Sequence, residues 1–317
     1  MKACNTFLLL LAVSAVHRSA SESLMYPYGP EAGDRVTPVK DDGASDEIPI
    51  SQKFTFFNKD YNSVFVNNNG VVSFATAVPS YTPDAFPLAD GRAFVAPYWG
   101  DVNNEITGKV YYRESKDPQL LQRISNDIEK YFPNLSFKAT WMFIATWFNV
   151  AYYGSVSNKV NTFQAVLATN GQRAFIMLNY DKIQWTTGTA SKGDPETGLG
   201  GIPAQAGFNS GDQTHFFNIP GSRTPDILNI KSTSNVNEPS RWVFQVDTFK
   251  VPGGCTYKAD FVKFGTVFWK DAACTQMCKC LESGELACEE HRCAGSETCQ
   301  PNLWYFTCQA PAENPCL

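Results

Sequence analysis

The placement of the cysteines constrains this chain of 317 residues more than any other feature. Cys4 is followed by no other cysteine until Cys255, and the other nine of the ten cysteines lie from Cys255 to Cys316. Residues 51–250 must therefore fold around a hydrophobic core alone. Residues 251–317 have the cysteine density of a small module that needs disulfides because its core is thin. We expect two domains, joined at Val251-Pro252-Gly253-Gly254.

The N-terminal segment has the features of a secretory signal peptide. Lys2 precedes an apolar run from Phe7 to Val16, and small residues follow from Ser19 to Ser21. The run is shorter than the roughly 20 residues of a bilayer-spanning helix. We therefore expect residues 1–21 to be a signal peptide and the mature protein to be secreted, without a membrane span. Residues 22–50 would form an N-terminal lead-in, with a solvated acidic stretch at Lys40–Glu47.

The region between lead-in and cysteine-rich module is predicted to be mainly β. Aromatic residues make up 14% of the chain, and they favour strands. Asn67-Asn68-Asn69-Gly70 separates Ser63–Val66 from Val71–Phe74, and Asn170-Gly171 separates Thr162–Ala168 from Ala174–Tyr180. Asn-Gly pairs supply the positive φ angles of tight hairpin turns, so two hairpins are expected.

Further strands and one helix complete the predicted sandwich. The long apolar runs Ala139–Val150 and Phe175–Leu178 indicate strands buried on both faces. Asp117 and Pro118 would begin an amphipathic helix that lies across a sheet. Its apolar face would contain Leu120, Leu121, Ile124, Ile128 and Tyr131. The other strand candidates are Phe54–Phe57, Lys109–Arg113, Thr140–Trp147, Thr214–Asn218 and Arg241–Val246.

The cysteines of the C-terminal module are expected to form disulfides, because exported proteins fold in an oxidising compartment. Eight of them allow 105 pairings, and spacing does not select one. They are Cys255, Cys274, Cys278, Cys280, Cys288, Cys293, Cys299 and Cys308. A zinc site with His291 is disfavoured, because Cys278-x-Cys280 lacks common zinc spacing. We expect the ninth, Cys316, to be unpaired in a truncated chain, to pair with a following domain, or to link two chains into a homo-oligomer.

Two other sites can be proposed from short patterns. Asp101, Asn103, Asn104 and Glu105 offer the hard oxygen ligands that calcium prefers, so they form a weak calcium candidate. The spacing is not that of a known calcium loop, and we favour a turn whose side chains satisfy backbone donors. Asn134-Leu135-Ser136 is the chain's single acceptor sequence for an N-linked glycan.

Composition and motifs argue against nucleic-acid binding and catalysis. The net charge is −5 and there is no run of Lys or Arg to neutralise phosphates. His215 and His291 are the only histidines after the signal segment, and neither adjoins an activated-nucleophile motif. His215 is expected to be structural. We therefore expect no enzyme activity and no cofactor apart from the weak calcium candidate.

Several ordered blocks of residues 50–248 resemble the NIDO domain family of nidogens and tectorin-like proteins. The resemblance implies a β-rich sandwich-like domain in an extracellular matrix protein. Ser240 departs from the family pattern, in which a glycine precedes the Arg241-Trp242 pair. The matching blocks are Phe56-Phe57 with Tyr61, Val64–Phe74, Val95–Val102, Thr146-Trp147, Asn161–Ala168, Ala204–Asn209 and Asn235–Asp247.

The cysteine spacing after residue 251 resembles a von Willebrand factor type C-like module, as found after the NIDO domain in tectorin-like proteins. Together the two resemblances imply a non-catalytic glycoprotein of the extracellular matrix or of cell-matrix adhesion. Its partners would be matrix or cell-surface proteins or glycans. The alternatives are a soluble recognition or defence lectin and, less in keeping with the residues, a glycan hydrolase with paired carboxylates in a cleft.

Overall fold

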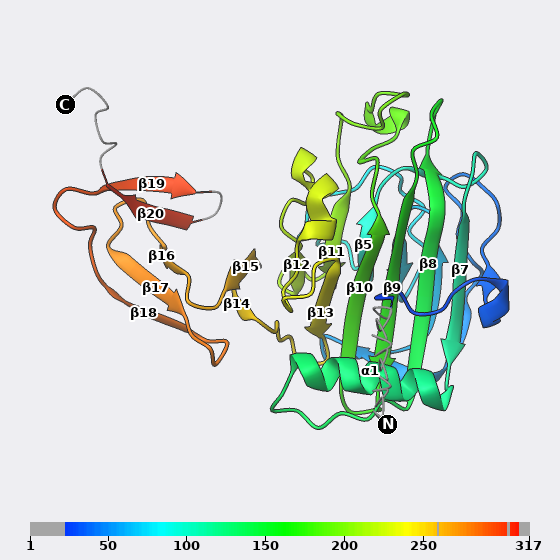
Figure 1. Cartoon of the computed structure of the whole chain (residues 1–317), viewed down its shortest axis with the longest axis horizontal. Helices are drawn as coiled ribbons and strands as arrows, with labels where there is room; N and C mark the ends of the chain where they lie inside the picture. The colour runs from blue at the N-terminus through cyan, green and yellow to red at the C-terminus, as the bar shows by residue number, and fades with distance from the viewer. Residues whose placement is uncertain (1–22, 259, 303–304, 311–317) are drawn as a thin grey trace, which may run out of the picture.

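The computed structural model describes residues 23–258, 260–302 and 305–310, and Figure 1 shows a large β domain with a smaller β arm. The large domain is a sandwich of two antiparallel sheets, which confirms the predicted mainly β class. In the first sheet the order is β1-β7-β8-β9-β10-β13, with β6 paired to β8. In the second sheet the order is β12-β11-β5-β4-β3-β2.

The strands of the sandwich are antiparallel to their neighbours and have the following bounds. The first sheet contains β1 (Arg35–Val36), β6 (Val102–Asn103), β7 (Lys109–Ser115), β8 (Trp141–Tyr152), β9 (Asn161–Thr169), β10 (Ala174–Lys182) and β13 (Arg241–Gln245). The second contains β2 (Ile48–Phe56), β3 (Lys59–Asn67), β4 (Val71–Ser73), β5 (Phe94–Trp99), β11 (Gln205–Asn209) and β12 (Phe216–Asn218). Short 3-10 turns are η1 (Pro30–Ala32), η2 (Thr189–Ser191) and η3 (Pro225–Ser232).

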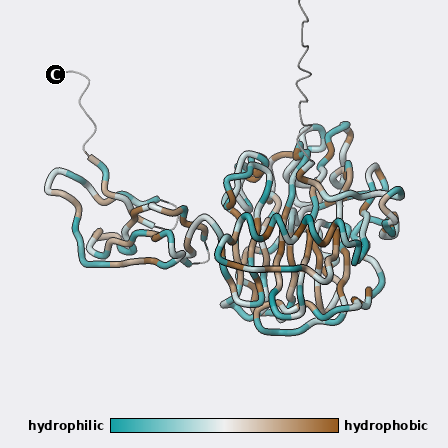
Figure 2. The backbone as a smooth tube through the Cα atoms, turned by 60° about the horizontal axis from the view of Figure 1, so that its bottom comes forward, coloured by the Kyte–Doolittle hydropathy of each residue, from teal (hydrophilic) through white to brown (hydrophobic). Residues whose placement is uncertain are grey.

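The core between the sheets is aromatic. Trp147 stacks on Phe163 with ring centroids 5.1 Å apart, and Phe208 contacts Phe244 edge to face at 5.0 Å. Trp141–Trp147 of β8 and Ala174–Tyr180 of β10 are buried, so the prediction of strands covered on both faces is confirmed for these two runs. Figure 2 shows the hydrophobic segments within the sandwich, where the strands run side by side.

Helix α1 (Pro118–Tyr131) covers the outer face of the first sheet and forms a third layer (Figure 1). The Asp117 carboxylate accepts hydrogen bonds from the N–H groups of Gln119 and Leu120, each at 3.0 Å, as predicted for a cap. Ile124 and Ile128 are buried against β8, β9 and β10. The amphipathic helix is therefore confirmed. At 14 residues α1 is the longest helix in the described part of the chain, where no helix has the length and apolarity to cross a bilayer.

Both predicted hairpins are present, but their turns differ in environment. β3 pairs with β4 around the turn at residues 68–70, and β9 pairs with β10 around residues 170–173. Asn68 and Asn69 are buried, whereas Asn170 is half-buried at the surface. Ser240, which replaces the expected glycine, has φ +75°, so this position needs the left-handed backbone conformation that glycine adopts with least strain.

The lead-in is packed against the sandwich. Tyr26 is fully buried, and its N–H donates to Gln164 Oε1 at 2.9 Å. The expectation of a solvated stretch at Lys40–Glu47 is wrong for its centre, where Gly43 and Ser45 are buried. Ser45 exchanges hydrogen bonds with the backbone of Val66, so the segment joins the first hairpin. Backbone pairing explains why an acidic, polar segment is ordered here.

The C-terminal module has a hairpin and a five-stranded sheet of order β18-β17-β16-β20-β19. All eight predicted cysteines pair, as Cys255–Cys280, Cys274–Cys299, Cys278–Cys288 and Cys293–Cys308. Signal residues 1–21 and Cys316 lie outside the described residues. The strands are β14 (Gly254–Tyr257), β15 (Asp260–Lys263), β16 (Val267–Trp269), β17 (Gln276–Cys280), β18 (Leu286–Glu290), β19 (Thr298–Asn302) and β20 (Tyr305–Gln309).

The connection between the two parts makes specific contacts. Phe261 of β15 packs edge to face on Trp242 at 5.5 Å. A side chain at Gly253 would collide with the carbonyl oxygen of Asn235, and the residue has φ +75°. Gly253 therefore allows the chain to turn into the module while it stays close to the sandwich.

Candidate functional site

The loops that follow β5, β8 and β10 meet at one end of the sandwich, beyond the upper ends of β8 and β10 in Figure 1. We call residues 100–108, 153–160 and 183–204 the loop end. Tyr153 N–H donates to the Asp101 carbonyl at 2.9 Å, and Thr189 N–H donates to the Tyr153 carbonyl at 3.0 Å. Val156 N–H donates to the Pro195 carbonyl at 3.0 Å. These bonds join the three loops into one surface.

The loop end exposes large apolar side chains. Val156 is 73% exposed, the largest value among the exposed large hydrophobic residues of the described chain. Isolated apolar residues are common on protein surfaces, but several at one end of a domain are typical of an interaction surface. The members are Ile106, Tyr153, Val156 and Leu199. The loop end therefore has the character of a binding surface.

A cluster of carboxylates lies beside this surface. Asp41 and Asp42 come from the lead-in, Asp101 follows β5, and one carboxylate oxygen of each lies within 4.8 Å of the others. We call these three residues the carboxylate cluster. Within the described residues, no ion pair found involves any of them. At an effective dielectric constant of ~20, two charges at this separation repel by about 3 kcal/mol.

Two of the carboxylates have a buried oxygen without a hydrogen-bond partner. These atoms are Asp41 Oδ1 and Asp101 Oδ2, and the Asp101 residue is only 2% exposed. Burial, with the charges of Asp42 and Asp41, raises the pKa of Asp101 to about 7, although the N–H of Ala190 opposes the shift. Burial and the charges of Asp42 and Glu105 likewise raise the pKa of Asp41. The cluster lacks positive charge.

The turn of the first hairpin positions the cluster. Asn69 Nδ2 donates to Asp42 Oδ1 at 2.7 Å, and Asn69 Oδ1 accepts from Val102 N–H at 2.9 Å. One side chain thus connects the lead-in to the residue after Asp101. On the far side, a side chain at Gly188 would collide with the Asp101 carboxylate. The Gly188 position therefore lets the η2 loop close over the cluster.

The structure divides the four residues of the predicted calcium site. Asp101 belongs to the carboxylate cluster, whereas Asn103 Oδ1 accepts from Glu105 N–H at 2.8 Å and Asn104 Oδ1 accepts from Lys40 N–H at 3.0 Å. These two amides satisfy backbone donors, as the turn interpretation expects. Sequence reasoning missed Asp41 and Asp42. Their acidic pair before Gly43 was the signal, but nothing local placed it beside Asp101.

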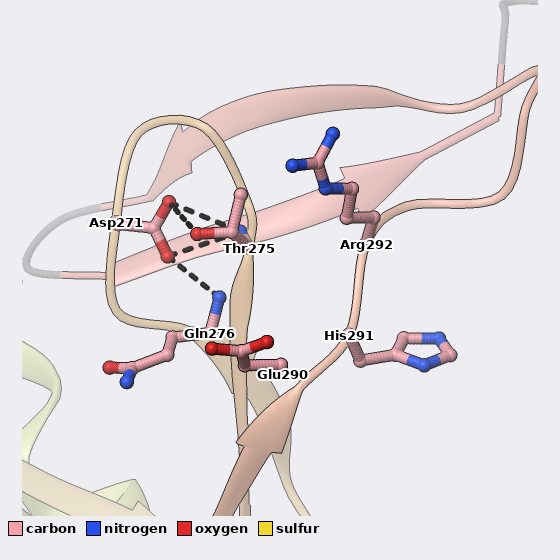
Figure 3. A pocket seen from close by; sticks show the side chains of 6 residues that line it. All are labelled: Asp271, Thr275, Gln276, Glu290, His291 and Arg292. Atoms are coloured by element: carbon pink, nitrogen blue, oxygen red, sulfur yellow. Dashed lines mark hydrogen bonds between the residues drawn. The ribbon is translucent and has the colours of Figure 1, made fainter.

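Two polar hollows lie outside the loop end and the carboxylate cluster. One, of about 560 Å³, is lined in the module by Asp271, Thr275, Gln276, Glu290, His291 and Arg292 (Figure 3). Its Asp271 carboxylate accepts hydrogen bonds from Gln276 N–H and from Thr275, which lower the pKa of Asp271. The second, of about 540 Å³, lies where the module meets the sandwich and includes Asn134, the predicted glycan acceptor, which is exposed.

The remaining candidates have structural surroundings. His215 Nδ1 lies 2.5 Å from Asp212 Oδ2, and its ring packs on Phe57 at 4.9 Å. It precedes β12, so the strand predicted from Thr214 begins two residues later. Cys278, Cys280, Cys288 and Cys293, the residues of the disfavoured zinc site, are all in disulfides.

A two-sheet sandwich with a disulfide-rich module defines an extracellular modular protein. The nidogen-like domain family matches residues 62–248, and the chain belongs to this NIDO family. No solved structure was found to match it.

Comparison with individual proteins places the chain more narrowly within the family. The chain is 50% identical to alpha-tectorin of Homo sapiens over 306 residues, which are 95% of this chain and 14% of that protein. It is 51% identical to alpha-tectorin of Gallus gallus, over 97% of this chain and 14% of that protein. Nidogen-1 of Mus musculus is 31% identical, over 70% of this chain and 19% of that protein. The chain is an alpha-tectorin-like, secreted NIDO protein of the extracellular matrix, and it spans about 14% of the length of its alpha-tectorin relatives.

Proposed function

We propose that this protein is a non-catalytic interaction module that binds matrix or cell-surface partners through the loop end. The observation that carries the proposal is the exposure of Ile106, Tyr153, Val156 and Leu199 on loops joined by backbone hydrogen bonds. A pre-formed apolar surface loses little conformational entropy on binding. The similarity to alpha-tectorin and to nidogen supports a role in matrix assembly or cell-matrix adhesion.

The carboxylates do not fit the hydrolase alternative. A glycosidase needs two carboxyl groups that touch the scissile bond of its substrate. Asp101 is 2% exposed and faces Gly188, so it is not positioned to contact a glycan. His215, the histidine of the large domain, contacts Thr214 Oγ1 and Asp212 Oδ2 through the same ring nitrogen, Nδ1. In a catalytic triad the nucleophile and the carboxylate contact different ring nitrogens, so this arrangement does not match one.

The lectin alternative expects calcium- or sugar-dependent binding through exposed aromatic residues or Asn/Asp turns, and among the turns its candidates are Asp101 and Asn103. Asn103 is 7% exposed, and its Oδ1 already accepts from Glu105 N–H. A partner therefore meets the exposed apolar residues of the loop end before it meets these polar groups. The geometry favours a protein partner over a sugar held by Asp101 and Asn103.

Matrix incorporation tests the proposal. The full chain would be secreted from cells that deposit a matrix, and the fraction in the detergent-insoluble layer would be measured. Leu199→Asp and Val156→Asp should each reduce that fraction at least threefold. Leu281→Asp is the matched control, because Leu281 is 37% and Leu199 is 38% exposed. Equal incorporation of Leu199→Asp and Leu281→Asp, at equal secretion, would overturn the loop end as the interface.

We also propose that Asn134 carries an N-linked glycan and that Cys316 links chains into disulfide-bonded oligomers. Asn134 is exposed after the end of α1, where an oligosaccharide can be accommodated. The eight described cysteines pair with one another, which leaves none of them for Cys316. A mobility shift after glycosidase treatment, lost in Asn134→Gln, tests the glycan.

A further inference from the structure

The carboxylate cluster combines two segments that are about sixty residues apart in the chain. Asp41 and Asp42 belong to the lead-in, whereas Asp101 belongs to the loop end. The Asp101 side chain is almost fully buried, and its Oδ2 has no hydrogen-bond partner. Asp41 Oδ1 is a second buried oxygen without one. A buried carboxylate oxygen without a donor is unfavourable, so these atoms need a proton, an ordered water or a cation.

We propose that Asp41, Asp42 and Asp101 bind one divalent cation of the calcium class, which fixes the lead-in to the loop end. Two protons would be needed to satisfy the two unpartnered oxygens, but one cation can contact all three carboxylates. The single hydrogen bond from Asn69 to Asp42 leaves the other oxygen of that carboxylate available as a ligand. The ion would supply the positive charge that no described ion pair provides.

The donor set selects the class of metal. All three donors are carboxylate oxygens, which hard cations prefer, and no histidine or cysteine belongs to this group. The three donor oxygens lie within 4.8 Å of one another, a separation that one calcium ion with oxygen ligands at 2.3–2.6 Å can span. Magnesium binds at about 2.0–2.1 Å and requires stricter octahedral geometry. Calcium accepts flexible coordination geometry, so it suits three carboxylates from two separate segments better than magnesium does.

The position of the cluster suggests what the ion does. The carbonyl of Asp101 accepts from Tyr153 N–H, and Tyr153 is one of the exposed apolar residues of the loop end. Asp42 is joined through Asn69 to Val102. An ion at Asp101 would therefore order the lead-in turn and the loops together. Binding of the ion is independent of any protein partner, so it can be tested with the metal alone.

Calorimetry and thermal unfolding of the full secreted chain, first stripped with a chelator, test the site. One calcium ion should bind with a Kd of about 0.1–1 mM, the range of extracellular modules. At 10 mM CaCl2 the melting temperature should rise by about 3 °C or more. Asp101→Asn and Asp41→Asn should each weaken binding at least tenfold. Asp46→Asn, an exposed lead-in carboxylate outside the cluster, should bind like the parent protein.

The melting temperature without metal shows whether the variants fold. Without metal, the melting temperature of Asp101→Asn should equal or exceed that of the parent protein, because the substitution removes a buried charge of the same sign as its neighbours. A second readout is cleavage by endoproteinase Lys-C after exposed Lys40, which calcium should slow several-fold in the parent protein and not in Asp101→Asn. If calorimetry shows no heat of binding and the melting temperature does not change up to 10 mM calcium, the proposed site is wrong. Equal calcium responses in the parent and in Asp101→Asn would also overturn the site, and an equal response to magnesium would overturn the calcium class.

Discussion

Replacement of Asn68 by alanine tests whether the first hairpin turn holds the lead-in in place. The Asn68 side chain is fully buried and accepts a hydrogen bond from Thr37 Oγ1 at 2.5 Å. Its Nδ2 donates to the carbonyls of Pro38 at 3.0 Å and Lys40 at 2.7 Å. Alanine removes these three bonds to the lead-in, together with a longer one of 3.5 Å from Nδ2 to Asn104 Oδ1.

The size of the effect follows from these bonds. A typical intramolecular hydrogen bond contributes about 0.5–1.5 kcal/mol net, so the loss of three lowers the free energy of unfolding by about 3 kcal/mol. In a domain of about 200 residues this corresponds to a decrease of roughly 6–12 °C in the melting temperature. The lead-in should open first, because it would then be held to the hairpin only by its remaining contacts, such as the Ser45–Val66 and Asn69–Asp42 bonds.

Urea unfolding and amide hydrogen exchange of residues 36–45 measure the two effects. Asn170→Ala is the control, since Asn170 also lies in a hairpin turn but accepts only from Gln172 and Arg173 N–H. We expect the control to lose about 1 kcal/mol or less and to keep the exchange protection of the lead-in. The reasoning would be refuted if both variants lost similar amounts of unfolding free energy. It would also be refuted if the amide hydrogen exchange of the lead-in were unchanged in Asn68→Ala.

Three further predictions concern charge and covalent links. Arg241 is 2% exposed and pairs with Asp127 at 3.1 Å, so Arg241→Met should lower the free energy of unfolding by about 3–5 kcal/mol, measured by urea titration. Burial raises the pKa of Asp260 to about 6, so its folded form binds a proton more tightly than its unfolded form. The module should therefore lose about 1 kcal/mol, after allowance for solvent screening, as pH rises from about 4 through 6. Calorimetry should show that Asp260→Asn removes this dependence, and a persisting slope would contradict it. Cys316→Ser should abolish the disulfide-linked species on non-reducing gels; their persistence would exclude Cys316 as the link.

The secondary structure of the sandwich was predictable because its signals are local. The alternation and apolar runs of β8, β9 and β10 depend on neighbouring residues, and so does the cap at Asp117. The two Asn-Gly turns also gave correct hairpins. They look alike in sequence, and only the fold shows that one is covered by the lead-in and the other is at the surface.

Packing of the lead-in was not predictable, because its contacts are distant in the chain. Tyr26 bonds to Gln164, which is 138 residues away, and Arg241 donates to the carbonyl of Leu24, 217 residues away. An acidic, glycine-containing segment is usually solvated, and no local pattern shows that its backbone pairs with a hairpin. The same limit applies to the cluster, of which sequence reasoning identified only Asp101.

The two parts of the protein are stabilised by different interactions, and this difference accounts for the cysteine distribution. The sandwich buries five tryptophans almost completely: Trp99, Trp141, Trp147, Trp185 and Trp242. Among the described residues of the module, the buried cluster consists of Val262, Phe268 and three cysteines. Its disulfides close loops of 10 to 25 residues, and each contributes about 3 kcal/mol by restricting the unfolded chain. Reduction of the disulfides should therefore unfold the module first. The sandwich would then lose the contact between Phe261 of the module and its own Trp242.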